Sequence, residues 1–222
     1  MSSNTSQKDI FANGEGDNWF LRNQEQKLGD ETRFFEIELL SNYLGEVLEP
    51  RYLEVGCSDG RQVFEFFHRL GGTAFGIDPS SKAIEKANLV AKQKGVDGNI
   101  HFTSGTADNL EFPDAYFHFL IFGFCLYLVD EHLLKGALLE GDRVLQPGGY
   151  LIIKDFDHPV TKKVIYKHDV RVFSYKRNYV EFYKSLDYAL VAKLSTNDQH
   201  RIIFDRNPDK RIATWLMQKP VK

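Results

Sequence analysis

The feature that most constrains the fold of this chain is a regular alternation. Short apolar runs alternate with longer segments in which apolar residues recur every three or four positions. The apolar runs lie at 52–55, 73–77, 100–104, 117–122 and 150–154. The segments with helical spacing lie at 30–48, 60–70, 80–94 and 131–145. Short buried strands that alternate with helices require a parallel sheet with helices on both faces. The sequence therefore predicts a doubly wound α/β fold.

The pattern changes after residue 155. A short helix is predicted at 179–186, and two longer strand patterns follow at 188–194 and 211–218, joined by a polar loop. Two terminal strands of this kind favour an antiparallel pair. We therefore expect a mostly parallel seven-stranded sheet that ends in an antiparallel strand pair. A length of 222 residues without repeats or a linker suits one domain, residues 1–222.

Composition excludes several classes of protein. No run of about 18 apolar residues occurs, and the N-terminus lacks the apolar core of a secretory signal. The two cysteines, Cys57 and Cys125, are too few for a disulfide framework or a Cys-rich metal site. We therefore expect a cytoplasmic protein with reduced thiols and no membrane partner, of open oligomeric state.

The net charge of −3 conceals an asymmetry along the chain. Residues 154–222 carry 15 basic and 8 acidic side chains, which leaves this part at about +7. These cations are spread among aromatic and acidic residues without a dense cluster, so nucleic acid is not the expected partner. An anionic small molecule, such as a phosphorylated or nucleotide-linked metabolite, is the expected substrate class.

Two motifs follow successive predicted strands. The first strand runs into a loop that contains Gly56 and Gly60, and the second ends at Asp78, 18 positions after Gly60. Glycines permit a tight turn against a ligand, and an acid at this distance can accept both hydroxyls of a ribose. The alternatives are a turn without a ligand and an Asp78 that only supplies negative charge to the following helix. Together the motifs favour a nucleoside site at the carboxyl edge of the sheet.

Four stretches carry a resemblance to a known family: LEVGCSDG at 53–60, GIDPS at 76–80, SGTADNLEFPD at 104–114 and LQPGGYL at 145–151. Over roughly residues 50–154 the chain resembles the class I S-adenosylmethionine-dependent methyltransferases. Nicotinamide enzymes differ, because their loop reads GxGxxG and leaves room for a pyrophosphate. Here the acidic Glu54 precedes the loop and would repel a pyrophosphate but attract an ammonium group.

The resemblance implies roles for individual residues. The loop Gly56 to Gly60 should line the methionine and ribose, Asp78 should hold the ribose hydroxyls, and Phe122 should lie beside the transferable methyl group. Thr106 stands where the family commonly has an acid, so Asp108 becomes a candidate for the adenine contact. We expect the Cys57 thiol to pack within the loop rather than react. The cofactor-binding residues implied in the core are Glu54, Gly56, Cys57, Gly60, Asp78, Pro79, Thr106, Ala107, Asp108 and Phe122.

An unusual polar-aromatic cluster, DNWFLRN at 17–23, precedes the first predicted core helix. Small methyltransferases of this kind often fold an N-terminal segment over the cofactor, so residues 1–29 are predicted to act as a lid. Trp19 or Phe20 would then shield the sulfonium, and Arg22 would bind the methionine carboxylate. The alternative is an ordinary helix start with surface residues. Under the lid interpretation, residues 30–154 form the cofactor-binding core and residues 155–222 face the substrate.

The sequence offers two candidates for a base that deprotonates an acceptor hydroxyl. His158 and His168 follow the fifth strand, and each has the alternative of a solvent-facing loop residue. We expect no metal site, because the adjacent residues Asp155, Asp157 and His158 rarely converge on one ion. The aromatic and basic segment 160–183 should shape the acceptor pocket, unless it only covers the core.

The expected reaction is methyl transfer from S-adenosylmethionine to a polar small molecule, at oxygen in the first instance. The stretch HDVRVFSYKRNY at 168–179 faintly resembles small methyltransferases of surface-polysaccharide assembly, which favours a sugar nucleotide or phosphorylated acceptor. One alternative is a subunit that binds the cofactor without catalysis. The other is a nucleic-acid methyltransferase, although no NPPY-like run follows the fourth strand, where 122–125 reads FGFC.

Overall fold

The structure, a computed structural model, describes residues 6–24, 34–43, 47–197 and 201–221. The strands are β1 (Arg51–Val55), β2 (Thr73–Asp78), β3 (Ile100–Ser104), β4 (Phe117–Gly123), β5 (Leu145–Phe156), β6 (Lys162–Ile165), β7 (Phe173–Lys176), β8 (Ala189–Asn197) and β9 (Arg211–Gln218). The helices are α1 (Gln7–Ile10), η1 (Phe11–Glu15), α2 (Gly16–Gln24), α3 (Phe35–Ser41), α4 (Arg61–Leu70), α5 (Ser81–Gln93), η3 (Leu126–Leu128), α6 (Glu131–Val144) and α7 (Val180–Lys184).

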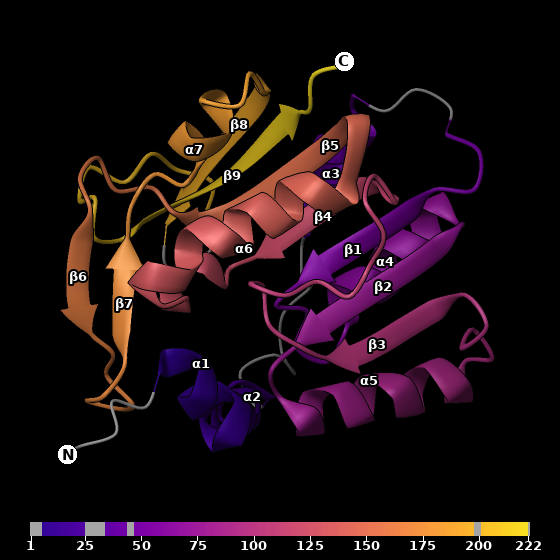
Figure 1. Ribbon diagram of the computed structural model, residues 1–222, viewed down its shortest axis with the longest axis horizontal. Helices are drawn as coiled ribbons and strands as arrows, with labels where there is room; N and C mark the ends of the chain where they lie inside the picture. The colour runs from indigo at the N-terminus through magenta and orange to yellow at the C-terminus, as the bar shows by residue number, and fades with distance from the viewer. Residues whose placement is uncertain (1–5, 25–33, 44–46, 198–200, 222) are drawn as a thin grey trace.

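Seven strands form one sheet in the order β3-β2-β1-β4-β5-β9-β8 (Figure 1). The first five of these strands are parallel, and β9 is antiparallel to both of its neighbours. The chain winds outward from β1 to β3 and then returns to the other side of β1 with β4. The predicted fold is confirmed: a mostly parallel seven-stranded sheet of the Rossmann-like methyltransferase type, with a C-terminal antiparallel pair.

Both faces of the sheet are covered by apolar side chains, as the buried parallel strands require. One face packs against α3, α4 and α5, and its core includes Leu40, Phe66 and Ala87. The other packs against α6 and α7, with Leu138 and Tyr183 in its core. Figure 1 shows α6 lying across this second face, above β4 and β5. These helices cover the two faces of the sheet, and the carboxyl ends of the parallel strands lie at its edge.

The β5 strand begins earlier than predicted. Leu145 already pairs with Phe117 and Tyr150 pairs with Phe119, so residues 146–149 form a bulge opposite a single residue of β4. Gly148 adopts the positive φ of 75° that this bulge uses. The residues PGG at 147–149, which precede the strand predicted at 150–154, therefore interrupt a longer strand. The helix predicted at 30–48 is shorter in the structure: α3 ends at Ser41, residues 42–43 form a turn, and 47–48 are not helical. Residues 30–33 and 44–46 lie outside the described residues.

Two structural units were not predicted: the β6–β7 hairpin and the helices α1 and α2. Gln7, which is buried, joins them. Its Nε2 donates to the carbonyl oxygens of Leu128 and Phe173, and its Oε1 accepts from the Phe173 N–H. Phe11 packs against Tyr166 of the hairpin loop in a small apolar cluster. The N-terminal segment is thus fixed to the hairpin and to the turn after β4.

Candidate cofactor-binding site

A cavity lies at the carboxyl ends of the parallel strands, where the strand order reverses between β1 and β4. This is the position at which open α/β sheets bind ligands. The strand-end loops line one side, and the N-terminal segment lines the other. The lining residues are Lys8, Phe11, Gly16, Trp19, Val55, Gly56, Asp78, Pro79, Gly105, Thr106, Ala107, Asp108, Gly123, Phe124, Cys125, Leu128, Val129, Asp130 and Leu133.

The loop after β1 needs both of its predicted glycines. Gly56 and Gly60 have φ of 80° and 77°, a region that side chains disfavour. A Cβ on Gly56 would lie 2.6 Å from Cβ of Cys125, and one on Gly60 would lie 2.4 Å from the Phe102 ring. Gly56 also lines the cavity with its backbone, whereas Gly60 begins helix α4 and is not among the lining residues.

Asp78 ends β2 and faces the cavity. Its Oδ2 accepts a hydrogen bond from the Ser58 N–H at 2.8 Å, and its Oδ1 accepts from the Ser80 N–H at 2.9 Å. Ser80 is the N-cap of α5, so the carboxylate supports this helix start as well as the loop after β1. A carboxylate oxygen can accept more than one hydrogen bond, so a backbone N–H and a ligand hydroxyl can share one oxygen. The two interpretations of Asp78 are therefore compatible.

The loop after β3 brings Thr106, Ala107 and Asp108 to the cavity, as predicted. Oδ2 of Asp108 lies 2.7 Å from Nζ of Lys8, on the N-terminal segment. Burial favours a higher pKa for Asp108, but hydrogen bonds from Lys8 and Thr106 outweigh it and hold the pKa below its usual value. Asp108 is therefore ionised at neutral pH and joins the core to α1.

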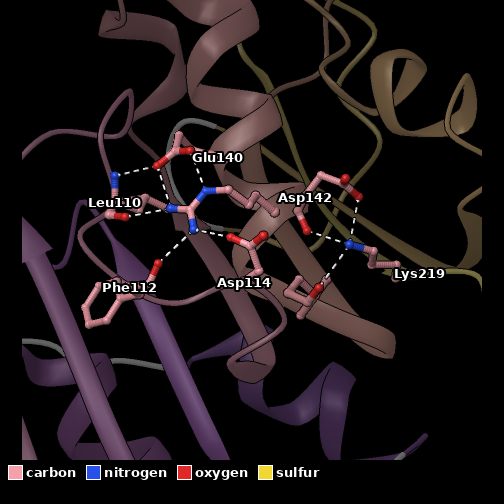
Figure 2. Close-up of polar contacts among 8 residues, drawn as sticks. Leu110, Phe112, Asp114, Glu140, Asp142 and Lys219 are labelled. Atoms are coloured by element: carbon pink, nitrogen blue, oxygen red, sulfur yellow. Dashed lines mark hydrogen bonds and ion pairs between the residues drawn. The ribbon is translucent and has the colours of Figure 1, made fainter.

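Helix α6 holds the segment that follows Asp108 in place (Figure 2). The guanidinium of Arg143 donates to the carbonyl oxygens of Leu110 and Phe112 and to the carboxylate of Asp114. Glu140, one turn earlier, accepts from both Arg143 and the Leu110 N–H. A planar guanidinium carries several N–H donors in a fixed arrangement, so it can bind several acceptors at once. The base of the predicted adenine loop is thus fastened to the main helix of this face.

Glu54 is buried near the cavity, although it is not one of the lining residues. A Cβ on Gly123 would lie 2.6 Å from Oε1 of Glu54, so the absence of a side chain at Gly123 makes room for the carboxylate. Val55, Gly56 and Gly123, which surround it in sequence or in space, all line the cavity. The predicted acid therefore lies directly behind the cavity wall.

Besides Glu54 and Gly60, two more predicted cofactor contacts, Phe122 and Cys57, are not among the lining residues of the cavity. Phe122 is fully buried on the α6 face, where its ring fills the space left by Gly141. The chain turns immediately afterwards, and Phe124, with a positive φ of 56°, lines the cavity in its place. Cys57 packs against Gly76 in the opposite core, and burial raises the pKa of its thiol. Its expected packing role is therefore the one the structure shows.

The N-terminal cluster is only partly arranged as expected. Trp19 lines the cavity, but Arg22 does not. The Arg22 guanidinium instead donates to the carboxylate of Glu15 and, at 3.2 Å, to the hydroxyl of Tyr166. Phe20 is buried beneath Lys86 of α5. The segment covers the cavity with Phe11 and Trp19, and Arg22 has a structural partner instead of the predicted contact to a carboxylate ligand.

Neither candidate histidine lies in this cavity. The Nδ1 of His158 is 2.6 Å from the Val160 carbonyl oxygen, and the ring lines a separate cavity between α6 and α7. His168 lies on the hairpin loop with its ring 5.2 Å from that of Tyr166. The carboxylate of Asp157 forms ion pairs with Lys193 and Arg211.

The sequence did not predict that the turn after β4 lines the site. Cys125, Leu128 and Asp130 all line the cavity from this turn. The Asp130 carboxylate accepts from the backbone N–H groups of Gln7 and Lys8, at 3.1 and 2.9 Å, and thereby holds the start of α1. The sequence shows only that an acid, Asp130, precedes a predicted helix. It does not show that Asp130 binds Gln7, which lies more than 120 positions away.

Asp155 holds the backbone of this turn by a hydrogen bond from the turn to its carboxylate. It is fully buried at the end of β5, where its Oδ2 accepts from the Tyr127 N–H at 3.2 Å and its Oδ1 from its neighbour Phe156 at 2.7 Å. Burial raises the pKa of Asp155 to about 8, despite these donors. Cys125, Tyr127 and Tyr179 are the titratable groups that sense its charge.

This pKa predicts a specific pH dependence of stability. Between about pH 4 and 8 the folded protein keeps a proton on Asp155 that the unfolded chain has released, so this group lowers the free energy of unfolding as pH rises. The slope is at most about 1.4 kcal/mol per pH unit. Asp155→Asn should remove this component of the slope while adding a pH-independent offset. Denaturant unfolding across that range measures it, and Asp97→Asn at an exposed position should leave the slope as in the parent.

Comparison with known proteins agrees with this geometry. Residues 53–149 match the family model described as a methyltransferase domain. The ubiquinone/menaquinone biosynthesis C-methyltransferase UbiE of Vibrio parahaemolyticus is 30% identical over 125 residues, which are 55% of this chain and 48% of that protein. UbiE of Vibrio vulnificus is 31% identical over 112 residues, 50% of this chain and 42% of that protein. The chain thus spans about half the length of the curated relatives it matches.

Solved structures share the fold at low sequence identity. A Burkholderia thailandensis 1,6-didemethyltoxoflavin-N1-methyltransferase, with its substrate and S-adenosylhomocysteine bound, has a TM-score of 0.68 at 15% identity, covering 96% of this chain and 87% of that chain. An S-adenosylmethionine-dependent methyltransferase of Methanosarcina mazei has a TM-score of 0.64 at 20% identity, covering 83% and 98%. Neither these matches nor the family model supports the surface-polysaccharide type. Residues 53–149 thus match a methyltransferase domain, and the chain has the Rossmann-like fold of S-adenosylmethionine-dependent methyltransferases.

Proposed function

We propose that this protein transfers the methyl group of S-adenosylmethionine to a small molecule. The observation that carries the proposal is the cavity at the switch between β1 and β4. Asp78 faces it from one strand end, and Gly56 and Gly123 leave its wall without side chains at the two adjacent strand ends. A carboxylate at a strand end and a wall of backbone suit a ribose and a methionine chain.

The described residues fit the parts of this cofactor. Asp78 would accept from the ribose hydroxyls, and the buried Glu54 behind Gly123 would attract the ammonium group. The Thr106–Asp108 loop, fastened by Arg143, would hold the adenine. When bound, the cofactor supplies a methyl group on a positively charged sulfur. The protein's part is to position it and to exclude water.

Apolar walls favour that reaction, because the positive charge of the sulfonium is lost as the methyl group leaves. Trp19 and Phe11 cover the cavity from the N-terminal segment, and Phe124 and Leu128 line it from the turn after β4. Close approach of acceptor and methyl group within such a closed site supplies much of the rate. No covalent intermediate on the protein is needed.

We propose an uncharged acceptor with an apolar or aromatic body over a phosphorylated one. Among the described lining residues Lys8 is the one cation, and Asp108 already pairs with it. The cations of segment 160–183 do not line the cavity: Arg171 pairs with Asp169, and Arg177 pairs with Glu131. The relatives are named for C- and N1-methylation, so the oxygen acceptor expected from the sequence stays a prediction.

Calorimetric titration with S-adenosylmethionine tests the binding half of the proposal. A radiolabelled methyl-transfer screen over quinones, phenols, heteroaromatic amines, sugar nucleotides and phosphorylated metabolites tests the catalytic half. Saturable cofactor binding without turnover on any acceptor would favour the non-catalytic subunit. Turnover only on RNA or DNA would favour the nucleic-acid enzyme.

Replacing His158 by Gln or His168 by Ala should leave turnover close to that of the parent. Neither ring lines the cavity, and a general base contributes roughly 10²–10⁴-fold to a rate. The measurement is the turnover number on whichever acceptor the screen identifies, with folding verified by circular dichroism. A loss of about a hundredfold in either variant would restore that histidine as the base.

A further inference from the structure

The loop between β8 and β9 exposes three consecutive apolar side chains. Ile202, Ile203 and Phe204 are 55%, 52% and 61% exposed. Single exposed apolar residues are ordinary on soluble proteins, but a contiguous group marks an interaction surface. These three lie away from the cofactor cavity, since none of them lines it.

The group is held by the framework. The Ile203 N–H donates to the Ser195 carbonyl oxygen, and the guanidinium of Arg211 lies 4.6 Å from the centre of the Phe204 ring. Farther along the loop, Lys162 of β6 binds both carboxylate oxygens of Asp209, at 2.7 and 2.6 Å. The loop is thus attached to β8, β9 and the β6–β7 hairpin while its apolar side chains face solvent.

Cations outnumber acids among the described residues around the apolar group. Arg201, Arg206 and Lys210 are exposed. The two described acids of the loop are less exposed: Asp209 is neutralised by Lys162, and Asp205 accepts a hydrogen bond from the Asn207 N–H. The surface therefore combines three exposed apolar side chains with three exposed cations. We call Arg201, Ile202, Ile203, Phe204, Arg206 and Lys210 the apolar–basic patch.

We propose that the apolar–basic patch docks this protein on an anionic lipid surface. The cations suit lipid phosphates, and the isoleucines and phenylalanine suit the boundary of the acyl chains. A second copy of this chain is a poor occupant, because a symmetric interface would place like cations against each other. Nucleic acid would satisfy the cations and leave the apolar side chains without a partner.

The proposal revises the expectation of no membrane partner, which came from the lack of a spanning segment. A helix suited to crossing a bilayer is not found in the part of the chain that the structure describes. Peripheral docking needs no such helix. The proposal is independent of the proposed methyl transfer, because no residue of the patch lines the cofactor cavity.

Sedimentation of the full chain with vesicles tests the patch. We expect binding to phosphatidylcholine vesicles that contain phosphatidylglycerol and little binding to phosphatidylcholine alone, with affinity falling as salt rises. Neutralising the cations (Arg201→Gln, Arg206→Gln, Lys210→Gln) should weaken binding roughly a hundredfold, at about tenfold or less per charge. The triple change of Ile202, Ile203 and Phe204 to Ser should weaken it comparably.

A matched control uses exposed apolar residues elsewhere. Leu48→Ser and Val221→Ser, at positions 88% and 83% exposed, should bind vesicles like the parent. Failure of the parent to bind anionic vesicles overturns the proposal, as does unchanged binding by both patch variants. Two further results would overturn it. One is size-exclusion chromatography in which the parent elutes as a dimer and the serine variant as a monomer. The other is binding of the parent to RNA but not to vesicles. The patch variants should still bind S-adenosylmethionine, so a loss of vesicle binding in them can be told apart from a failure of the proposed function.

Discussion

Replacing Asp78 by alanine will weaken binding of S-adenosylmethionine by about 1–3 kcal/mol, or roughly 5- to 150-fold. The carboxylate faces the cavity and is placed to accept from a ribose. Its loss also leaves the N–H groups of Ser58 and Ser80 without their acceptor, so the loop after β1 and the start of α5 become less ordered. Calorimetric titration with S-adenosylmethionine and with S-adenosylhomocysteine measures the effect, which should be similar for both because both carry the ribose.

Asp97→Ala provides a control with the same change of charge at an exposed position, and it should bind the cofactor like the parent. A second variant, Asp78→Asn, keeps one acceptor oxygen and should lose less affinity than the alanine. Unchanged affinity in Asp78→Ala would show that the ribose lies elsewhere, and the assignment of the cavity would then fail.

The second large effect is expected from Gly56→Ala. The positive φ of Gly56 costs an alanine about 1–2 kcal/mol, and contact of the new Cβ with Cys125, at 2.6 Å, costs about 1–3 kcal/mol more. The free energy of unfolding should fall by the sum of these. Cofactor affinity should fall with it, because Gly56 forms part of the cavity wall. Denaturant unfolding and calorimetry measure the two effects.

Gly95→Ala separates the cost of the backbone angle from the cost of the close contact. Gly95 has a positive φ of 66°, but nothing lies within 4 Å of a Cβ placed there. This variant should show the backbone cost alone. In a double-mutant cycle, Cys125→Gly should recover part of the stability lost in Gly56→Ala, since it removes the atom that the new Cβ meets. Equal destabilisation at Gly56 and Gly95, with no recovery, would argue against the close approach of the two loops.

Much of the core could be predicted from the sequence because its signals are local. An apolar run followed by a glycine turn, as at Val55–Gly56, encodes a buried strand and its ligand-facing end within a few residues. Asp78 could be identified for the same reason, since strand ends of a parallel sheet meet at one edge. The strand β9 was predicted with its observed limits, Arg211–Gln218, because an apolar strand between polar loops is also a local pattern.

The rest depends on contacts between distant residues or on a single backbone angle. Phe122 and Phe124 are alike in type, and the positive φ of Phe124 decides which of them reaches the cavity. The partners of Lys8 and Arg22 lie on other elements, and no spacing rule connects Lys8 with Asp108 or Arg22 with Tyr166. The β6–β7 hairpin was missed because its aromatic and basic residues have neither a clear strand nor a clear helical period.

The attachment of α1 on both sides of the cavity has a kinetic consequence. Asp130 holds the backbone of Gln7 and Lys8, and Asp108 holds the Lys8 side chain. If a bound nucleoside leaves past this helix, these bonds must open first. Its residence time would then be governed by detachment of the first turn rather than by its own contacts, and amide hydrogen exchange of residues 7–10 should slow when the product stays bound.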